Sequence, residues 1–298
     1  MFFSFLNKKN KKNSPLKTTS ADFLSLEKAP PENFVERFRE VVSDPLNLLI
    51  KRIPSAGYID KEHCIILHNG NRVPRGGPGA YYDDYSDLLI INRGVHEPLE
   101  EYCFQQMLEA LNNESPSMIE LGSYWAHYSM WIKKIKPAAR CFMVESDETN
   151  LLAGKENFKR NGMEGVFIKD FVAENAFSID QFFAIQHMEK LDILHSDIQG
   201  YEYEMIKGAR RSLQERRIDY IFISTHSDEL HSQLENEIKF LGYRLEVSSN
   251  FSRDTTSYDG FILATSPNIK PIFKEWQPWG RIQINQSTPE AILKYLNQ

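Results

Sequence analysis

The sequence predicts an α/β fold built on a mostly parallel sheet. From residue 116 onward, short apolar runs alternate with stretches in which apolar residues recur at helical spacing, a pattern typical of βαβ units. The last two runs, Arg244–Val247 and Phe261–Ala264, follow one another with no helix pattern between them, which predicts one antiparallel edge strand. Ligands of such sheets bind beyond the carboxyl ends of the strands, so the residues there are the candidates for chemistry.

The elements expected from these patterns follow in a regular order. Strands are expected at Met118–Leu121, Cys141–Val144, Val166–Ile168, Leu191–Leu194 and Tyr220–Ile223. Helices are expected between them, over Tyr128 to Ile135, Leu151 to Phe158, Met205 to Leu213 and Leu230 to Leu241. Asn161-Gly162 and Gly242 supply C-terminal stop signals for two of these helices.

The chain divides into four predicted parts. Residues 1–29 form a flexible basic tail and residues 30–115 an N-terminal α+β extension or cap. Within the cap we expect helices over Asn33 to Val42 and from Pro98, and a hairpin turn at Asn69-Gly70. Residues 116–266 form the main α/β domain, and residues 267–298 a C-terminal extension.

Composition excludes several classes of protein. The 298 residues are 41% hydrophobic and 26% charged, with a net charge of −6, which is globular composition and argues against a general nucleic-acid binder. The N-terminus runs from apolar to basic, the reverse of a signal peptide. No later run approaches the length of a membrane span. We therefore expect a cytoplasmic protein without stable membrane insertion.

The first two strand ends favour a nucleoside site. Glu120 and Gly122-Ser123 lead into a helix, whose free N–H groups attract carboxylates and phosphates. Glu145 ends the second strand 23 residues after Gly122, which places an acidic residue to bind both ribose hydroxyls. The first loop lacks the G-x-G-x-x-G pattern of a dinucleotide site, so a nicotinamide cofactor is disfavoured.

The later strand ends carry candidates for adenine binding and catalysis. Asp170, beside Phe171, is placed to bind an adenine amino group, or it is a turn residue. Asp197 follows the fourth strand and His226 the fifth, and strands joined through a helix are usually neighbours. The pair is either a base with its orienting partner or two ligands of a divalent metal. His127, early in the first helix, is a further catalytic candidate.

These residues lie in segments that resemble the FkbM family of class I S-adenosylmethionine-dependent methyltransferases. The segments are Met118–Ser123 with Tyr128-Ser129, Met143–Ser146, Asn157–Gly162 and, most specifically, Leu191–Glu202, which ends in Asp197-Ile198-Gln199-Gly200-Tyr201-Glu202 and is followed by Ile206–Ala209 and Leu213. The later Leu241-Gly242-Tyr243 and Asp259-Gly260 also fit. The resemblance implies a Rossmann-like sheet of seven strands, a methyltransferase domain at residues 116–266, and S-adenosylmethionine as methyl donor.

The resemblance also implies roles for residues. Glu120, Gly122 and Ser123 would lie along the methionine part, Glu145 at the ribose, Asp170 at the adenine and Asp197 near the methyl group. Tyr124, Ser129 and Ser146, in the same segments, complete the expected donor-binding set. Ala126 stands where the family usually has a second glycine, and bulky Tyr124-Trp125 precede it, which would narrow the donor loop.

We therefore expect an O-methyltransferase acting on a hydroxyl of a sugar, glycan or related natural product, because family members commonly do so. An alkyl hydroxyl is a weak nucleophile and needs a base or a metal, here Mg²⁺ or Mn²⁺, held by Asp197 and His226. Tyr81, Tyr82 and Tyr85 are candidates for contacting this small-molecule or glycan acceptor. The alternatives are a non-catalytic binding module with the same fold, and an NAD-dependent oxidoreductase or epimerase.

Overall fold

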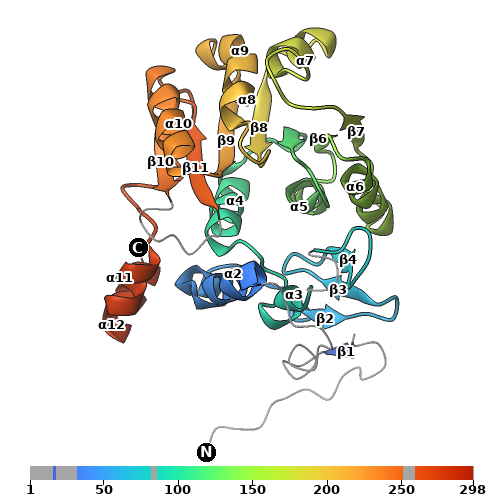
Figure 1. Ribbon diagram of the computed structural model, residues 1–298, viewed down its shortest axis with the longest axis vertical. Coiled ribbons are helices and arrows are strands. Elements are labelled where there is room, and N and C mark those ends of the chain that lie inside the picture. The colour runs from blue at the N-terminus through green and yellow to red at the C-terminus, as the bar shows by residue number, and fades with distance from the viewer. Residues whose placement is uncertain (1–15, 18–31, 82–85, 251–258, 298) are drawn as a thin grey trace, which may run out of the picture.

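The computed structural model describes residues 16–17, 32–81, 86–250 and 259–297. Its centre is a seven-stranded sheet with the order β10-β11-β9-β8-β5-β6-β7 (Figure 1). The strands are β5 (Ser117–Leu121), β6 (Arg140–Glu145), β7 (Val166–Lys169), β8 (Leu191–Ser196), β9 (Ile218–Thr225), β10 (Arg244–Ser249) and β11 (Gly260–Thr265). The strands β5 to β9 pair in parallel. The predicted seven-stranded, mostly parallel sheet is confirmed.

The antiparallel strand is not at the edge, and this detail of the prediction is wrong. β11 pairs antiparallel with both β9 and β10, so it lies between them and β10 forms the edge. The chain leaves β9 through helix α10, forms β10 on the outside, and returns through β11 into the place beside β9. As a result, the first residue of β11, Gly260, lies at the same end of the sheet as the carboxyl ends of the parallel strands.

Helices cover both faces of the sheet. On one face lie α4 (Pro98–Ala110), α5 (His127–Ile135) and α6 (Glu148–Arg160), and on the other α7 (Ile179–Ile185), α8 (Glu202–Gly208), α9 (Arg210–Gln214) and α10 (Asp228–Phe240). Alternation along the strands builds both cores: Met118 faces the first set of helices and Ile119 the second. Helix α7 was not predicted from the sequence.

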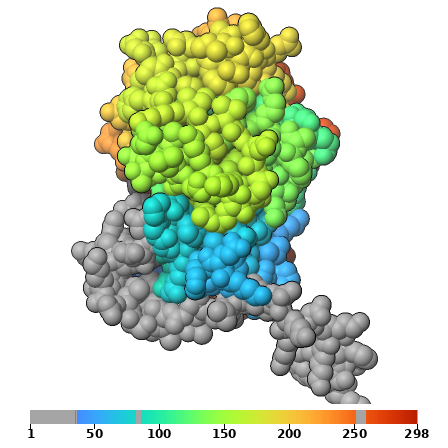
Figure 2. Space-filling model, turned by 90° about the vertical axis from the view of Figure 1, so that its right-hand side faces the viewer, coloured from blue at the N-terminus to red at the C-terminus, as the bar shows by residue number. Residues whose placement is uncertain are grey.

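The N-terminal segment packs onto the same framework. It contains α2 (Glu32–Ser43), the short 3₁₀ helix η1 (Pro45–Leu48), α3 (Asp87–Ile91), and a small antiparallel sheet of β1 (Leu16–Lys17), β2 (Tyr58–Ile59), β3 (Cys64–Ile66) and β4 (Arg72–Pro74). Figure 2 shows the coloured part of this segment, blue to cyan, directly against the green and yellow-green surface of residues that follow it in the chain. The division into four parts stays a prediction.

Helix α4 shows how closely the two parts are joined. The carboxylate of Glu100 accepts a hydrogen bond from Ser224 Oγ at 2.9 Å and contacts the ring of His195, so it reaches β8 and β9.

The C-terminal helices are α11 (Arg281–Gln286) and α12 (Pro289–Leu296). Among the helices in the described ranges, none combines the length and apolarity that a bilayer crossing requires.

Candidate functional site

Two connected cavities lie at the carboxyl ends of β5, β6 and β8. The first has a volume of about 220 Å³ and the second about 430 Å³, and Gly122, Tyr124, Asp197 and Gln199 line both. The first is also lined by Arg37, Tyr81, His96, Glu97, Glu120, Ser123, Trp125, His127, Tyr128, His195 and Asp259. The second is also lined by Val144–Asp147, Asn150, Asp170–Val172, Ile198 and Tyr201. The cavities therefore occupy the place where the fold predicts ligands.

The second cavity has the features of a nucleoside slot. Glu145 ends β6, and its carboxylate accepts hydrogen bonds from the backbone N–H groups of Tyr124 at 3.1 Å and Asp147 at 2.9 Å. These bonds hold the carboxylate in place and leave lone pairs for hydroxyl donors. Phe171 and Tyr201 meet edge to face with centroids 4.6 Å apart, and Asp170 beside them is exposed. An aromatic surface next to a carboxylate suits a purine ring.

Gly122 lines both cavities. Its φ of 68° is in the left-handed region, and a Cβ at this position would lie 1.7 Å from the carbonyl oxygen of Asp197. The sequence predicts a close approach of Gly122 to a ligand. The structure shows a close approach to the backbone of Asp197, which brings the ends of β5 and β8 together.

The unusual aromatic loop after Gly122 contacts the N-terminal segment. The Tyr124 hydroxyl donates a hydrogen bond to the carbonyl of Ala80 at 3.0 Å. Trp125 is buried against Tyr81 and stacks on His127 at 4.9 Å. Ala126, with φ of 62°, adopts the left-handed conformation that favours glycine. The bulky side chains thus hold this loop against the N-terminal segment.

Glu120 and Ser129 lie behind the first cavity. The Glu120 carboxylate accepts hydrogen bonds from the backbone N–H groups of Tyr128 at 3.3 Å and Ser129 at 3.0 Å, at the start of α5. Burial raises the pKa of Glu120. Ser129 is buried and is not among the residues that line either cavity. Glu120 thus reaches the first cavity, while donor binding by Ser129 stays a prediction.

Asp197 and His226 meet as predicted, inside a larger network. The His226 Nε2 atom lies 3.2 Å from Asp197 Oδ1 and 3.7 Å from Asp259 Oδ1, and the opposite nitrogen, Nδ1, lies 2.9 Å from the buried Glu202 carboxylate. Glu202 also accepts hydrogen bonds from the backbone N–H groups of Ile198 and Gly200. Three carboxylates therefore surround one imidazole, and two of them, those of Asp197 and Asp259, line the first cavity.

The charges of this network follow from its geometry. Burial lowers the pKa of His226, but hydrogen bonding to Asp197 and Glu202 outweighs it and raises that pKa to about 10. Burial raises the pKa of Asp259, and the negative charge of Asp197 adds to this, so it reaches about 7. Burial also acts upward on the pKa of Asp197, yet contact with His226 lowers it overall. At neutral pH the imidazole is a cation and Asp259 titrates.

The other predicted site residues are placed as follows. Ser123 lines the first cavity and Ser146 the second. Tyr81 is buried, receives a hydrogen bond from Arg37 and lines the first cavity. His127 also lines it, and burial, aided by the charge of His96, lowers its pKa well below the usual value. Tyr82 and Tyr85 lie outside the described residues.

Sequence reasoning missed several residues of the first cavity. Arg37 on α2 pairs with Glu97 at 2.8 Å, and Glu97 also accepts a hydrogen bond from the Tyr128 hydroxyl at 3.1 Å. No local pattern in the sequence marks Arg37. Asp259 had a signal, because an antiparallel strand begins where its parallel neighbours end. In the register Gly260 lies opposite Thr225, which sets Asp259 beside His226.

Comparison with known families identifies the class of protein. The model described as "Methyltransferase FkbM domain" matches residues 77–245, more than half of the chain. The chain belongs to the FkbM methyltransferase family, whose S-adenosylmethionine-dependent class I fold its sheet reproduces. The match begins within the segment expected as the cap.

Comparison with solved structures gives distant neighbours. The methyltransferase domain of METTL16 is 14% identical over 80% of this chain and 92% of that one, with a TM-score of 0.46. TrmK of M. capricolum, in complex with S-adenosyl-homocysteine, is 13% identical over 65% and 81%, with a TM-score of 0.38. Precorrin-6y C5,15-methyltransferase of Geobacter metallireducens is 17% identical over 55% and 89%, with a TM-score of 0.40. No curated protein matches the chain.

Proposed function

We propose that the protein transfers the methyl group of S-adenosylmethionine to a hydroxyl oxygen of a sugar, glycan or related natural product. The observation that carries this proposal is the convergence of Asp197 and Asp259, which line the first cavity, on the imidazole of His226. A weakly acidic hydroxyl needs a nearby group that accepts its proton as the new bond forms. This network offers one.

The donor would occupy the second cavity and extend past Gly122. Glu145 would accept the ribose hydroxyls, Asp170 and Phe171 would contact the adenine, and Glu120 and Ser123 would lie along the methionine part. In this placement the sulfonium approaches Asp197, so a cation meets a carboxylate. Family membership favours this donor over a nicotinamide.

In the transfer step the acceptor oxygen forms a bond to the methyl carbon as the carbon–sulfur bond breaks, and the sulfonium becomes a neutral thioether. Asp259, with a pKa of about 7, would take the hydroxyl proton. His226, already a cation, would stabilise the developing oxygen charge. Glu202 and Asp197 would hold the imidazole in position.

The cavity's lining supports a sugar-like acceptor. Tyr81, Trp125 and Tyr128 supply aromatic surface, while Arg37 and Glu97 supply polar groups. This combination suits a ring with apolar faces and a hydroxyl rim. Acceptor contact by Tyr82 and Tyr85 is part of the same proposal.

A metal-assisted reaction is the second candidate. It is favoured by the ligand atoms of Asp197, Glu202 and His226, which lie within 4.8 Å of one another. Mg²⁺ or Mn²⁺ held there would lower the pKa of a bound hydroxyl. Loss of turnover on chelation, with recovery on adding either ion, would select this route over the Asp259 route.

The experiment has two stages. Calorimetric titration with S-adenosyl-homocysteine, with NAD as the control ligand, tests the donor, and Glu145→Ala should weaken binding. A screen of glycosides with isotopically labelled S-adenosylmethionine then tests transfer. Binding of NAD instead would support the oxidoreductase alternative. Donor binding without transfer to any acceptor would support the binding module.

A further inference from the structure

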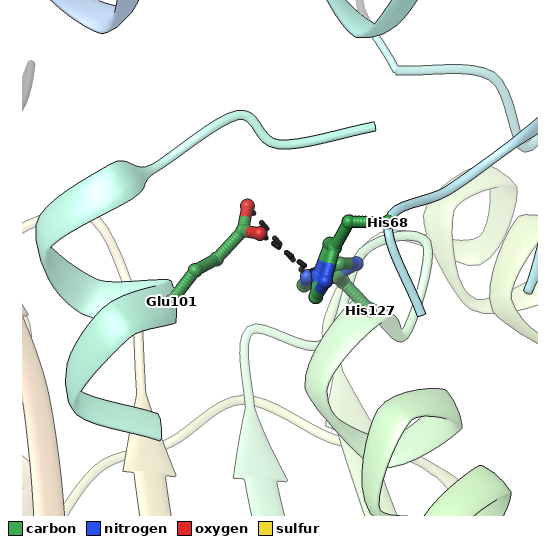
Figure 3. A group of neighbouring side chains, drawn as sticks. All are labelled: His68, Glu101 and His127. Atoms are coloured by element: carbon green, nitrogen blue, oxygen red, sulfur yellow. Dashed lines mark ion pairs between the residues drawn. The ribbon is translucent and has the colours of Figure 1, made fainter. Parts of the chain in front are cut away.

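A second cluster of histidine and glutamate lies between the N-terminal segment and helix α5. His68 comes from the connection between β3 and β4, Glu101 from the first turn of α4, and His127 from the first position of α5. Their side chains are 1%, 0% and 2% exposed. Figure 3 shows Glu101 projecting from its helix towards both imidazole rings. Three segments far apart in sequence thus place their polar ends at one buried point.

Five of the six polar side-chain atoms of this cluster lack a hydrogen bond within the described part of the chain, Oε1 of Glu101 being the exception. Both ring nitrogens of His127 and of His68 lack a hydrogen-bond partner among the described residues, as does Oε2 of Glu101. Buried polar atoms are nearly always paired, and exceptions indicate a missing water or ion. One ligand bound between the three side chains would give these buried atoms the partner that they lack.

The distances fit ligands arranged around one small cation. His68 Nε2 lies 2.9 Å from Glu101 Oε2, and His127 Nε2 lies 3.8 Å from Glu101 Oε1. Neighbouring ligands of a tetrahedral Zn²⁺ lie roughly 3.3 Å apart, given metal–ligand bonds of about 2.0–2.1 Å. The two separations lie on either side of this value, and His68 and Glu101 form no aligned hydrogen bond with one another. This is the arrangement of two ligands that share a third partner.

The residues around the cluster orient the Glu101 carboxylate and shield the three side chains from water. The backbone N–H groups of His96 and Glu97 donate hydrogen bonds to Glu101 Oε1 at 2.8 and 3.1 Å, and His96 Nδ1 lies 2.6 Å from the same oxygen. Trp131 meets the ring of His68 edge-on at 4.3 Å. Partners of this kind, outside the ligands themselves, fix ligand orientation in metal sites.

We propose that His68, Glu101 and His127 form a binding site for a divalent transition-metal ion of the Zn²⁺ type, separate from the Asp197–His226 network. Two imidazoles and one carboxylate are a donor set that Zn²⁺ takes in proteins. The bound ion would tie the β3–β4 connection to α4 and α5. It would also fix the Trp125–His127 wall of the first cavity.

The test measures metal content in the full chain after removal of any affinity tag. Protein stripped with a chelator and re-equilibrated with Zn²⁺ should retain about one ion per chain by elemental analysis. His127→Gln and Glu101→Gln should weaken Zn²⁺ binding at least ~100-fold, and His96→Gln, which acts through Glu101, about 10- to 100-fold. His187→Asn, at an exposed histidine, is the matched control and should bind as the wild type does.

Two further measurements keep the outcome decisive if a variant fails to fold. Zn²⁺ should raise the melting temperature of the wild type and leave that of His127→Gln unchanged. Co²⁺ in the wild type should give the strong visible absorption of a tetrahedral site with nitrogen ligands. Failure of the wild type to retain metal overturns the proposal. Retention lost in His226→Asn but kept in His127→Gln also overturns it, because the metal then sits in the other cluster.

Discussion

The two histidine–carboxylate clusters differ in their ratio of carboxylates to imidazoles. Around His226, three carboxylates share one imidazole, and the imidazole becomes a cation with a pKa raised to about 10. Around Glu101, one carboxylate is shared by His68, His96 and His127, and burial holds the pKa of His127 far below its usual value. In the first cluster the imidazole is held as a cation, whereas in the second the lowered pKa of His127 leaves a neutral imidazole with a free nitrogen lone pair.

The two clusters also differ in how much of their side chains is exposed to solvent. The Asp197 side chain is 32% exposed and lines both cavities, so a ligand there can reach it, and the neighbouring His226 side chain is 15% exposed. Glu101 has no exposed surface. A group that must meet substrate needs an opening, whereas a structural ion is held best where water cannot compete. Residue type alone does not separate these roles; the ratio and the burial do.

The largest effect is expected from the acid-rich cluster. Asp259→Asn should lower turnover by about 10²- to 10⁴-fold, because the proton acceptor is lost. Wild-type turnover should decrease below about pH 7, as protonation of a single group, Asp259, removes the base. The pH profile of the variant should lack this decrease. The measurement is the pH profile of kcat with the acceptor identified by screening. Glu229→Gln, at an exposed carboxylate near His226 in sequence, is the control. Unchanged turnover in Asp259→Asn would remove Asp259 from the transfer step.

Removing the orienting carboxylate should cost stability. Glu202→Leu leaves the His226 cation without its Nδ1 partner and two backbone N–H groups without their acceptor. We expect a loss of about 3–5 kcal/mol in the free energy of unfolding, the usual cost of breaking a buried charge pair. Denaturant titration measures it, with Glu204→Gln on the same helix as control. A loss below ~1 kcal/mol would show that His226 is neutral in the folded protein.

An effect of opposite sign is expected from Asp259 on stability. Its pKa is about 7 in the folded protein, above the ordinary value of 3.8. Between those values the folded state keeps a proton that the unfolded state releases, so wild-type stability falls as the pH rises through this window. Asp259→Asn should therefore raise the free energy of unfolding near pH 8, by up to about 4 kcal/mol for the full shift from 3.8 to about 7, and leave it unchanged near pH 4. Thermal melts across this range measure the difference, and an equal effect at both pH values would contradict the raised pKa.

The Asp197–His226 pair of the acid-rich cluster could be predicted from the sequence, and the histidine-rich cluster could not. Asp197 and His226 each follow a strand, and the two strands are joined through helices, so their proximity follows from topology. Glu100 and Glu101 stand in the first turn of a helix, which normally indicates solvated charges that favour the helix dipole. Both are buried instead, because α4 lies between the main sheet and the N-terminal segment.

The pairing of distant segments explains the remaining failures. His68 follows a strand of three residues, and its position depends on the small sheet and on α5, which no local periodicity encodes. Arg37 reaches the first cavity only because α2 packs over the strand ends. Tertiary contacts between segments that are distant in the sequence determine where such residues lie. The seven-stranded sheet itself was predictable because hydrophobic periodicity is a local signal.

The smallest effect is expected at Ala126, the residue that presents His127 to the histidine-rich cluster. Ala126→Gly relieves the left-handed backbone strain, worth ~1 kcal/mol, but removes a buried methyl group worth about 0.8 kcal/mol, so stability should change by less than ~0.5 kcal/mol. The Cβ of Ala126 faces Gly154 of α6 and lines neither cavity. The affinity for S-adenosyl-homocysteine should therefore stay within about threefold of the wild type by calorimetry. A tenfold gain in affinity would show instead that this position restricts the donor loop, and that the His127 wall and the donor cavity are coupled through it.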